Sequence, residues 1–349
     1  MNPEQNPGNA NTLLSTYSFD EIYDLIAKDF VGSVAKYPID AAPIFIKKVI
    51  PNQTGNQRQF NEKDFTTFAR TKPEAVAARK GTFGIGFHKQ MNKKRIALEL
   101  ELTYEARTEN RWDDVTEISQ KLADTAPQRR NLDMTHLAIT FAQGTSYVDM
   151  DGFTIDTTTG DGLSIANAAH KLAFSPTTYT NIITGAPAFS KNALILAETI
   201  AVNNTLDNFG IPGTMRWSHI WTANNPNNIE LIQQFLKSIS DNTQANANVE
   251  NTYRNRYKML VLSQLATDAR GQRDVTKLNW WGLGAFDGQI AGDRLQAYWG
   301  EWEAAHMKPA PTNGSNAEDF SRDIWKYAVR EGYGLCIVSA RGILYSFVS

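Results

Sequence analysis

Cysteine and long apolar runs are scarce in this sequence. Cys336 is the one cysteine among 349 residues, which excludes a disulfide framework and a cysteine-based zinc site. The most apolar stretches, 191–202 and 335–348, are interrupted by Glu198 and Arg341, so no membrane-spanning helix and no membrane partner are expected. The first twelve residues are polar and lack the basic and apolar regions of a secretory signal. We therefore expect a soluble protein that stays in the compartment where it is made.

The sequence also lacks the local motifs of common catalytic and metal sites. It contains no P-loop, no HExxH pair and no nucleophile elbow. Asp149 starts a stretch similar to an EF-hand loop, but Phe153 and Gly160 stand where that loop needs oxygen ligands. The histidines lie far from one another and from the cysteine: His88, His136, His170, His219 and His306. We predict no catalytic residue, no metal, no cofactor and no enzymatic activity, with Cys336 as a small buried residue in a strand.

The composition is that of a globular chain, but its charge is unevenly distributed. Hydrophobic residues make up 42% and charged residues 21%, and the formal net charge is −2. Residues 45–95 contain twelve Lys or Arg and three acidic residues, giving +9, whereas residues 1–44 carry −4 and the remainder −7. A basic segment in an acidic chain indicates an anionic ligand or a second copy of the chain as partner. A solvated basic surface is the alternative.

Helical and strand patterns are mixed along the chain without a β-α-β alternation, which predicts an α+β fold. Helices are predicted at 18–31, 108–144, 190–203 and from 225. Pro127 is expected to interrupt or end the helix at 108–144. Strands are predicted at 44–50, 215–221, 257–265, 278–283 and 295–302, followed by a three-strand meander at 324–330, 334–340 and 343–348.

The clearest local pattern predicts a β-hairpin. Apolar residues alternate with glycine over Phe83–Phe87, and apolar and polar residues alternate over Ile96–Tyr104, on either side of a polar turn at 90–94. The glycines indicate a place where another backbone approaches closely. A two-stranded hairpin is marginally stable alone, so its apolar face must be covered by the rest of the chain or by a neighbouring subunit.

Tryptophans occur in two close pairs, Trp280 with Trp281 and Trp299 with Trp302. Such pairs stack on a sugar or a base in some proteins, and in others they pack in a core or a subunit interface. The first alternative corresponds to a soluble carbohydrate-binding or hydrolytic α+β protein with a concave aromatic site.

Three groups of segments, in order, resemble tailed-phage major capsid proteins of the HK97 fold, especially the Mu-type major head subunits. Together they cover residues 60–349. They are the basic segment and strands at 61–104 with the helix at 108–144; Gly160–His170 with the helix at 190–203, the turn at 210–212 and the passage at 247–257; and Asp323–Arg330 with the glycines that follow and Arg341–Gly342.

The resemblance implies an HK97-like α+β fold and a shell-forming function. Its parts are an N-terminal arm with a short helix at 1–60, an extended β-hairpin called the E-loop at 61–107, a peripheral P-domain with a long spine helix at 108–150 and 314–349, and an A-domain with P-domain excursions at 151–313. Subunits of this family form hexamers and pentamers of an icosahedral shell around double-stranded DNA, which is contacted without sequence specificity. The implied location is the virion, after synthesis in the host cytoplasm, with portal, scaffolding and decoration proteins as further partners.

The resemblance also suggests which residues join subunits, because the E-loop would lie across the adjacent subunit. The hypothesis is that basic side chains pair with an acidic surface of the neighbour, while apolar side chains become buried there. These residues are Lys89, Lys93, Lys94 and Arg95, and Phe83, Phe87, Ile96 and Leu98. An encapsulin-like nanocompartment, which shares the fold, remains an alternative that differs in cargo.

Overall fold

The structure is a computed structural model of the whole chain. It describes residues 27–28, 30, 32–34, 36–51, 55–65, 74, 77, 83–103, 112–213, 215–239, 250–288, 294–309 and 324–348. The predicted N-terminal arm and most of the helix expected at 18–31 lie outside the described residues. Within the described ranges, helices and strands are mixed, so the predicted α+β class is confirmed.

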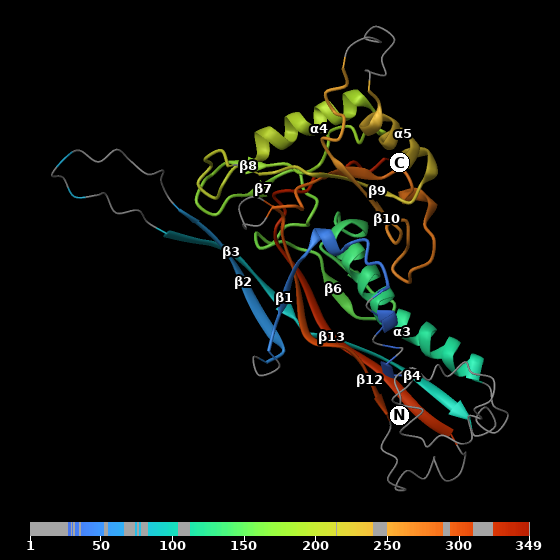
Figure 1. Cartoon of the computed structure of the whole chain (residues 1–349). Helices are drawn as coiled ribbons and strands as arrows, with labels where there is room; N and C mark the ends of the chain where they lie inside the picture. The colour runs from blue at the N-terminus through green and yellow to red at the C-terminus, as the bar shows by residue number, and fades with distance from the viewer. Residues whose placement is uncertain are drawn as a thin grey trace.

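A four-stranded sheet forms the elongated lower part of the molecule (Figure 1). Its order is β1 (Ile46–Val49), β12 (Gln296–Pro309), β13 (Ile324–Ser339) and β4 (Lys94–Thr103). β1 runs parallel to β12, and the other neighbours are antiparallel. The sheet therefore joins segments from the beginning, the first third and the end of the chain.

One long helix, α3 (Trp112–Thr135), follows β4 and contacts β4 and β13. It continues into η4 (His136–Thr140), a π-helical turn. The long helix predicted from the sequence is confirmed, but Pro127 lies inside it without ending it. A proline in a helix loses one backbone hydrogen bond. Ala123, Ala126 and Pro127 are buried, so packing of this turn against the body offsets the loss.

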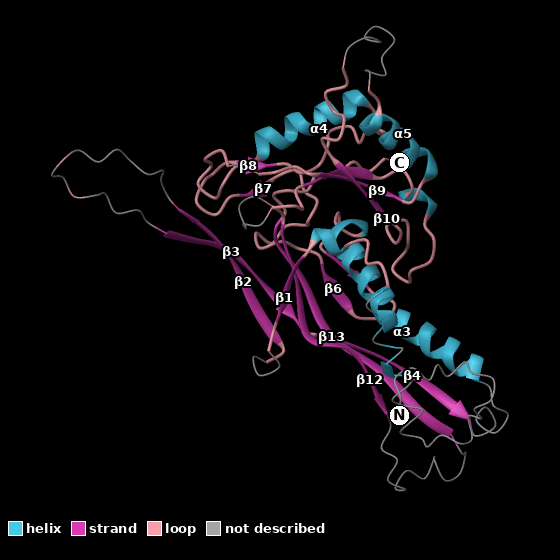
Figure 2. Cartoon of the chain, in the orientation of Figure 1, coloured by secondary structure: helices cyan, strands magenta, loops and turns pink. Residues whose placement is uncertain are grey.

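A second layer stands above the sheet (Figure 2). It contains a three-stranded sheet in the order β10 (Lys258–Leu262), β9 (His219–Ala223) and β11 (Trp281–Gly284). Helices α4 (Lys191–Asn204) and α5 (Pro226–Lys237) enclose a shared core with it. Both helices match the sequence predictions, and their N-caps are supplied by the side chains of Ser190 and Asn225.

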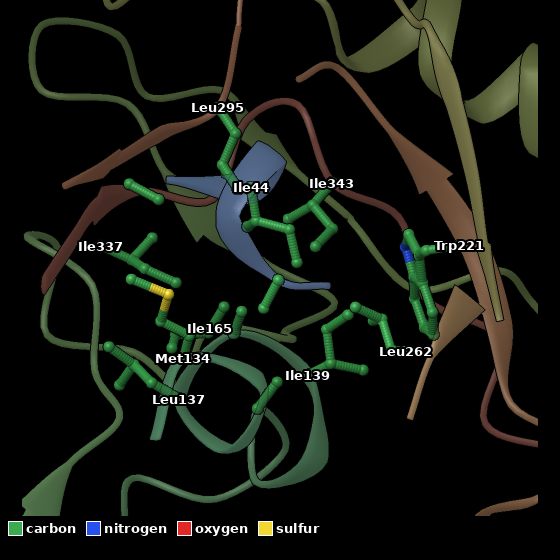
Figure 3. Close-up of a cluster of buried hydrophobic side chains, with 14 of the residues drawn as sticks. Ile44, Met134, Leu137, Ile139, Ile165, Trp221, Leu262, Leu295, Ile337 and Ile343 are labelled. Carbon is green, nitrogen blue, oxygen red and sulfur yellow. The ribbon is translucent and has the colours of Figure 1, made fainter. Parts of the chain in front are cut away.

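The main core lies where the two layers meet. Figure 3 shows Met134 and Ile139 of the helix end beside Ile44 of η2 (Ala42–Ile44), Trp221 of β9 and Ile337 of β13. All five side chains are buried. Because this core takes residues from both sheets and from the helix, the layers form one body.

Three two-stranded pairings and one short helix complete the described elements. They are β2 (Gln57–Phe65) with β3 (Phe83–Asn92), β5 (Ser146–Val148) with β6 (Thr154–Asp156), β7 (His170–Lys171) with β8 (Thr178–Tyr179), and η6 (Val275–Lys277). In the described part of the chain, no helix is both long and apolar enough to cross a membrane.

The predicted hairpin is wrong in its pairing. β3 and β4 exist as strands, but they do not pair with each other: β3 pairs with β2, and β4 pairs with β13. The alternation of side chains identifies a strand and its faces, and it carries no information about the partner strand. The polar residues at 90–94 mark a change of sheet at Lys93 instead of a reversal of direction. The hairpin that includes β3 is therefore β2–β3.

The predicted three-strand meander is also wrong. Residues 324–339 form the single strand β13, with Gly332 and Gly334 inside it. Gly334 pairs with Gly300 of β12. A Cβ atom at Gly334 would lie 2.5 Å from the Asn92 carbonyl, and one at Gly300 would lie 2.6 Å from Met91 Sδ. These glycines therefore allow β3 to lie close against the sheet and do not form turns.

Candidate functional site

The root of the β2–β3 hairpin rests on the central sheet. Tyr333 contacts α3, so its neighbour Gly334 points to the opposite face, where β3 crosses. Met91 of β3 is fully buried there, and the ring of Phe60 on β2 stacks on Tyr298 with centroids 4.4 Å apart. These contacts fix the root of the hairpin on the face that α3 does not cover.

The two glycines of β3 permit a second close contact. A Cβ atom at Gly84 would lie 2.6 Å from the ring of Phe174, which stacks on Phe209 with centroids 4.7 Å apart. A Cβ atom at Gly86 would lie 2.9 Å from Asn208 Nδ2. The sequence predicts a close approach at these glycines, and the structure supplies it through side chains instead of another backbone.

A buried carboxylate anchors the hairpin between these contacts. Glu62 of β2 accepts a hydrogen bond from Arg341 Nη2 at 3.0 Å and another from Asn208 Nδ2 at 2.9 Å. Arg341 also donates to Ser339 Oγ at 3.1 Å and to the Leu206 carbonyl at 2.7 Å. Nothing in the sequence singles out Glu62 except that it is one of three acidic residues in the basic segment.

A second buried polar contact holds the neighbouring loop. His170 Nδ1 lies 2.9 Å from Asp161 Oδ2, and Nε2 lies 3.1 Å from the Ile165 carbonyl. Each ring nitrogen of His170 therefore faces an oxygen acceptor. Burial acts to raise the pKa of Asp161, but hydrogen bonds from His170 and Thr159 outweigh it and hold the pKa well below its usual range.

Two lysines of the basic segment lie beside carboxylates of their own chain. Lys89 Nζ lies 2.5 Å from Asp156 Oδ2. Lys94 Nζ lies 2.8 Å from both Asp133 Oδ2 and Asp149 Oδ2. Both ammonium groups therefore form ion pairs within the chain, and their pairing with a neighbouring subunit stays a prediction. Their positive charge holds β3 and β4 to the body.

The remaining predicted residues do not share one surface. The side chain of Phe83 lies outside the described residues. Ile96 packs against the main core, and Phe87 and Lys93 are half-buried. Arg95 and Leu98 are exposed, as is Ile85 of β3. Their role between subunits therefore stays a prediction.

A cavity of about 450 Å³ lies beside the point where β3 continues into β4. It is enclosed by the 89–95 backbone, the end of α3, β6 and β13. Leu137, Ile155 and Leu335 give apolar walls, and Asp151 and Asp156 contribute carboxylates. Apolar walls with a few polar groups are typical of binding pockets.

Exposed apolar side chains gather at the β5–β6 turn, next to this cavity. Phe153 is 65% exposed, and Val148 and Met150 are also exposed. The side chains of Asp151 and Asp156 are about half-exposed beside them. Single exposed apolar residues are ordinary, but three within six residues form a patch. This surface, Val148–Asp156, is called the β5–β6 edge below.

The tryptophan pairs belong to the core. Trp280, Trp281, Trp299 and Trp302 are all buried, none of them more than 9% exposed. The packing interpretation is therefore confirmed, and these four rings offer no stacking platform for a sugar. Cys336 is buried in β13 as predicted, and burial raises the pKa of its thiol to about 12.

One serine–histidine–aspartate group occurs in the second layer. Ser218 Oγ lies 2.8 Å from His219 Nδ1, but it also accepts the backbone N–H of Phe286 at 3.1 Å. His219 Nε2 is 3.8 Å from Asp287 Oδ1, beyond hydrogen-bond distance. The hydroxyl thus anchors a turn instead of serving as a nucleophile. Among the described residues, no group of three His, Cys, Asp or Glu is arranged to hold a metal ion.

No family model and no curated protein sequence matches the chain. It is similar to the capsid structure of the cyanophage P-SCSP1u (TM-score 0.49, 10% identity, 88% of this chain and 86% of that one). For the capsid of an empty GTA particle, the TM-score is 0.49 and the identity 8%, over 89% of this chain and 90% of that one. For a virus-like particle from Pyrococcus furiosus, the TM-score is 0.43 and the identity 10%, over 93% of this chain and 99% of that one. Similarity at this level does not assign a function, and the Mu-type detail of the sequence resemblance stays a prediction.

Proposed function

We propose that this chain is the subunit of a self-assembling protein shell, a major capsid protein of the HK97-like class. The β2–β3 hairpin is the observation that carries the proposal. Figure 1 shows both strands running to one side of the body. An isolated two-stranded β-ribbon is only marginally stable in water. Here Met91, Glu62 and the two glycines of β3 fix its root, which is what an arm that reaches a neighbouring subunit requires.

We propose that the hairpin of one copy docks at the β5–β6 edge of the next. The sequence between the two strands, 66–82, has four basic residues and one acidic residue. The β5–β6 edge carries two half-exposed carboxylates, Asp151 and Asp156, which pair with Arg129 and Lys89 of the same chain, together with exposed Phe153. Each exposed ion pair contributes about 0–1 kcal/mol, whereas a fully buried large apolar side chain contributes about 1.5–3 kcal/mol. Apolar burial would therefore dominate affinity, and charge would set the register.

Electron microscopy of the purified chain, with mass measured by light scattering, tests the proposal. Closed shells, tubes, or free hexamers and pentamers are the expected result. A uniform monomer or dimer at high protein concentration and low salt, unchanged by a crowding agent, would overturn it.

A matched pair of variants tests the docking surface. Phe153→Asn should keep the fold, because the side chain is 65% exposed, and should raise the protein concentration needed for assembly. Val49→Asn, at another exposed apolar position on β1, should leave that concentration unchanged. Circular dichroism establishes that both variants are folded. Equal assembly of Phe153→Asn and wild type would remove the β5–β6 edge from the proposal.

We further propose that the shell consists of hexamers and pentamers and encloses double-stranded DNA without reading its sequence, with a portal and scaffolding or decoration proteins as partners. The support is the sequence resemblance. Shells isolated from cells that carry the whole gene cluster should contain nuclease-protected double-stranded DNA. Shells that protect a protein cargo and no DNA would identify a nanocompartment instead.

A further inference from the structure

We propose that Glu62 is a positioning residue that fixes the direction in which the β2–β3 hairpin leaves the body. The inference deepens the proposed function and rests on it for its consequence, because the hairpin is the part of the chain that we propose docks on the neighbouring subunit. Glu62 is 2% exposed, in the middle of a nine-residue strand. Its two carboxylate oxygens are bound by different segments, so the contact defines an orientation as well as a distance.

Both partners of Glu62 are themselves held in place. The guanidinium of Arg341 uses Nε on Ser339 and Nη1 on the Leu206 carbonyl, which leaves Nη2 directed at Glu62. The amide of Asn208 donates to Glu62 and accepts the backbone N–H of Ala173 at 3.3 Å. Charge-assisted hydrogen bonds from fixed donors give both strength and direction. The carboxylate therefore joins β2 to the chain after β13 and to the 206–208 loop at once.

The second strand of the hairpin lies over the same contact. A Cβ atom at Gly86 of β3 would lie 2.9 Å from Asn208 Nδ2 and 3.1 Å from Glu62 Oε2. The aromatic contact farther out, under Gly84, involves Phe174, which is 44% exposed. Ring contacts of this kind tolerate sliding, whereas two hydrogen bonds from fixed donors, one to each carboxylate oxygen, are directional. The direction of the hairpin therefore depends on Glu62.

The surroundings make the charge of Glu62 necessary. Tyr179 is buried and stacks on His170, with ring centroids 5.0 Å apart. Burial raises the pKa of Tyr179, and the charges of Arg341, Glu62 and Asp161 all act on it. The guanidinium of Arg341 and the carboxylates of Glu62 and Asp161 thus share one buried region. A neutral residue at position 62 would remove the carboxylate charge that faces the buried guanidinium of Arg341, and β2 would lose the contact that holds it in place.

The test measures the hairpin direction itself. Spin labels at Ile85→Cys on β3 and Val202→Cys on α4 use two exposed positions, and buried Cys336 should not react. Electron–electron double resonance is recorded on labelled full-length chain mixed with excess unlabelled chain. Wild type should give one narrow distance distribution, and Glu62→Gln should broaden or shift it. Glu62→Gln with the wild-type distribution would overturn the inference, whatever its stability.

A matched variant separates positioning from general stability. Glu331 is a buried carboxylate of β13 that pairs with Arg130 of α3. Glu331→Gln should lower the thermal stability and leave the label distances unchanged. Equal broadening by Glu331→Gln and Glu62→Gln would show a general loosening and overturn the inference.

A third variant covers the case in which Glu62→Gln does not fold. Gly86→Ala keeps every charge and places a methyl group against Asn208 and Glu62, so it should shift the distance distribution. An unshifted distribution would count against the inference. The label distances do not require assembly. If wild type forms no shells but Glu62→Gln still broadens the distribution, the positioning role stands and the shell function falls.

Discussion

Acidification should destabilise this chain through the buried histidine His136. His136 is 1% exposed at the start of η4, and its Nε2 lies 2.8 Å from the hydroxyl of Thr267. That hydroxyl donates its own proton to the Gln264 carbonyl, so Nε2 must be the donor to it. The rings of Phe141 and Tyr147 stand edge-on against the imidazole. A proton added to the second nitrogen would bring a positive charge into an apolar site.

The size of the effect follows from the pKa. Burial is the largest influence and lowers the pKa of His136 from 6.5 to about 4; Asp133 opposes this shift and Lys277 adds to it. The unfolded chain takes up a proton near pH 6.5, and the folded chain does so near pH 4. The stabilising contribution is therefore complete above pH 6.5 and is lost as the pH falls toward 4. Each unit of pKa difference corresponds to about 1.36 kcal/mol, so the free energy of unfolding falls by about 3 kcal/mol in total.

Urea unfolding followed by tryptophan fluorescence measures this loss. Between pH 7.5 and 4.5, wild type should lose about 2 to 3 kcal/mol more free energy of unfolding than His136→Gln, which has no imidazole to titrate. His306→Gln removes an exposed histidine and is the matched control. It should lose as much as wild type. Equal losses in wild type and His136→Gln would refute the reasoning, because the imidazole would then accept its proton equally well in both states.

Three further substitutions test the packing that positions the hairpin and the second layer. Met91→Ala should lower the free energy of unfolding by about 2–5 kcal/mol, measured in urea, because the side chain is fully buried under the sheet glycines. Gly334→Ala should lower the melting temperature, since its Cβ would lie 2.5 Å from the Asn92 carbonyl, whereas Gly213→Ala has space and should not. Ser190→Ala removes the N-cap of α4 and should lower the free energy of unfolding in urea by about 1 kcal/mol.

Local signals predicted the helices well. Ser190 and Asn225 are N-cap residues followed by helical periodicity, and both begin helices in the structure. The long helix α3 was also predicted, but Pro127 does not end it, because buried packing around this residue overrides the local penalty. A helix closes its hydrogen bonds within a few residues, so the sequence nearby contains most of the information needed to predict it.

Strand partners could not be predicted in the same way. The ladder of β4 with β13 joins residues more than two hundred positions apart, such as Lys94 and Tyr333. Alternation in Ile96–Tyr104 specifies faces and says nothing of this partner. Gly332 and Gly334 were ambiguous for a related reason: a glycine marks either a turn or a close approach, and the approaching strand, β3, is distant in sequence.

The pairing at the hairpin root had no sequence signal. Glu62 and Arg341 are separated by 279 residues; Arg341 belongs to the Arg341–Gly342 segment of the resemblance, but Glu62 belongs to no motif. A buried charge is identified by what surrounds it, and the surroundings here come from the end of β13 and from the 206–208 loop. The sequence indicated a basic segment correctly. It did not distinguish lysines that form ion pairs within the chain from basic residues that could contact another subunit.

That distinction separates two groups among the twelve basic residues of the 45–95 segment. Lys47, Lys89 and Lys94 pair with carboxylates of the same chain, so their charge holds β1, β3 and β4 to the body. The four basic residues of 66–82 are the part that the proposed docking uses. Exposed charges are screened by salt within about 10 Å at 0.1 M, and partly buried pairs are screened much less. Raising the salt concentration should therefore weaken assembly while the free energy of unfolding of the unassembled chain changes little. If light scattering and urea unfolding showed both quantities falling together, the charge would not be divided in this way.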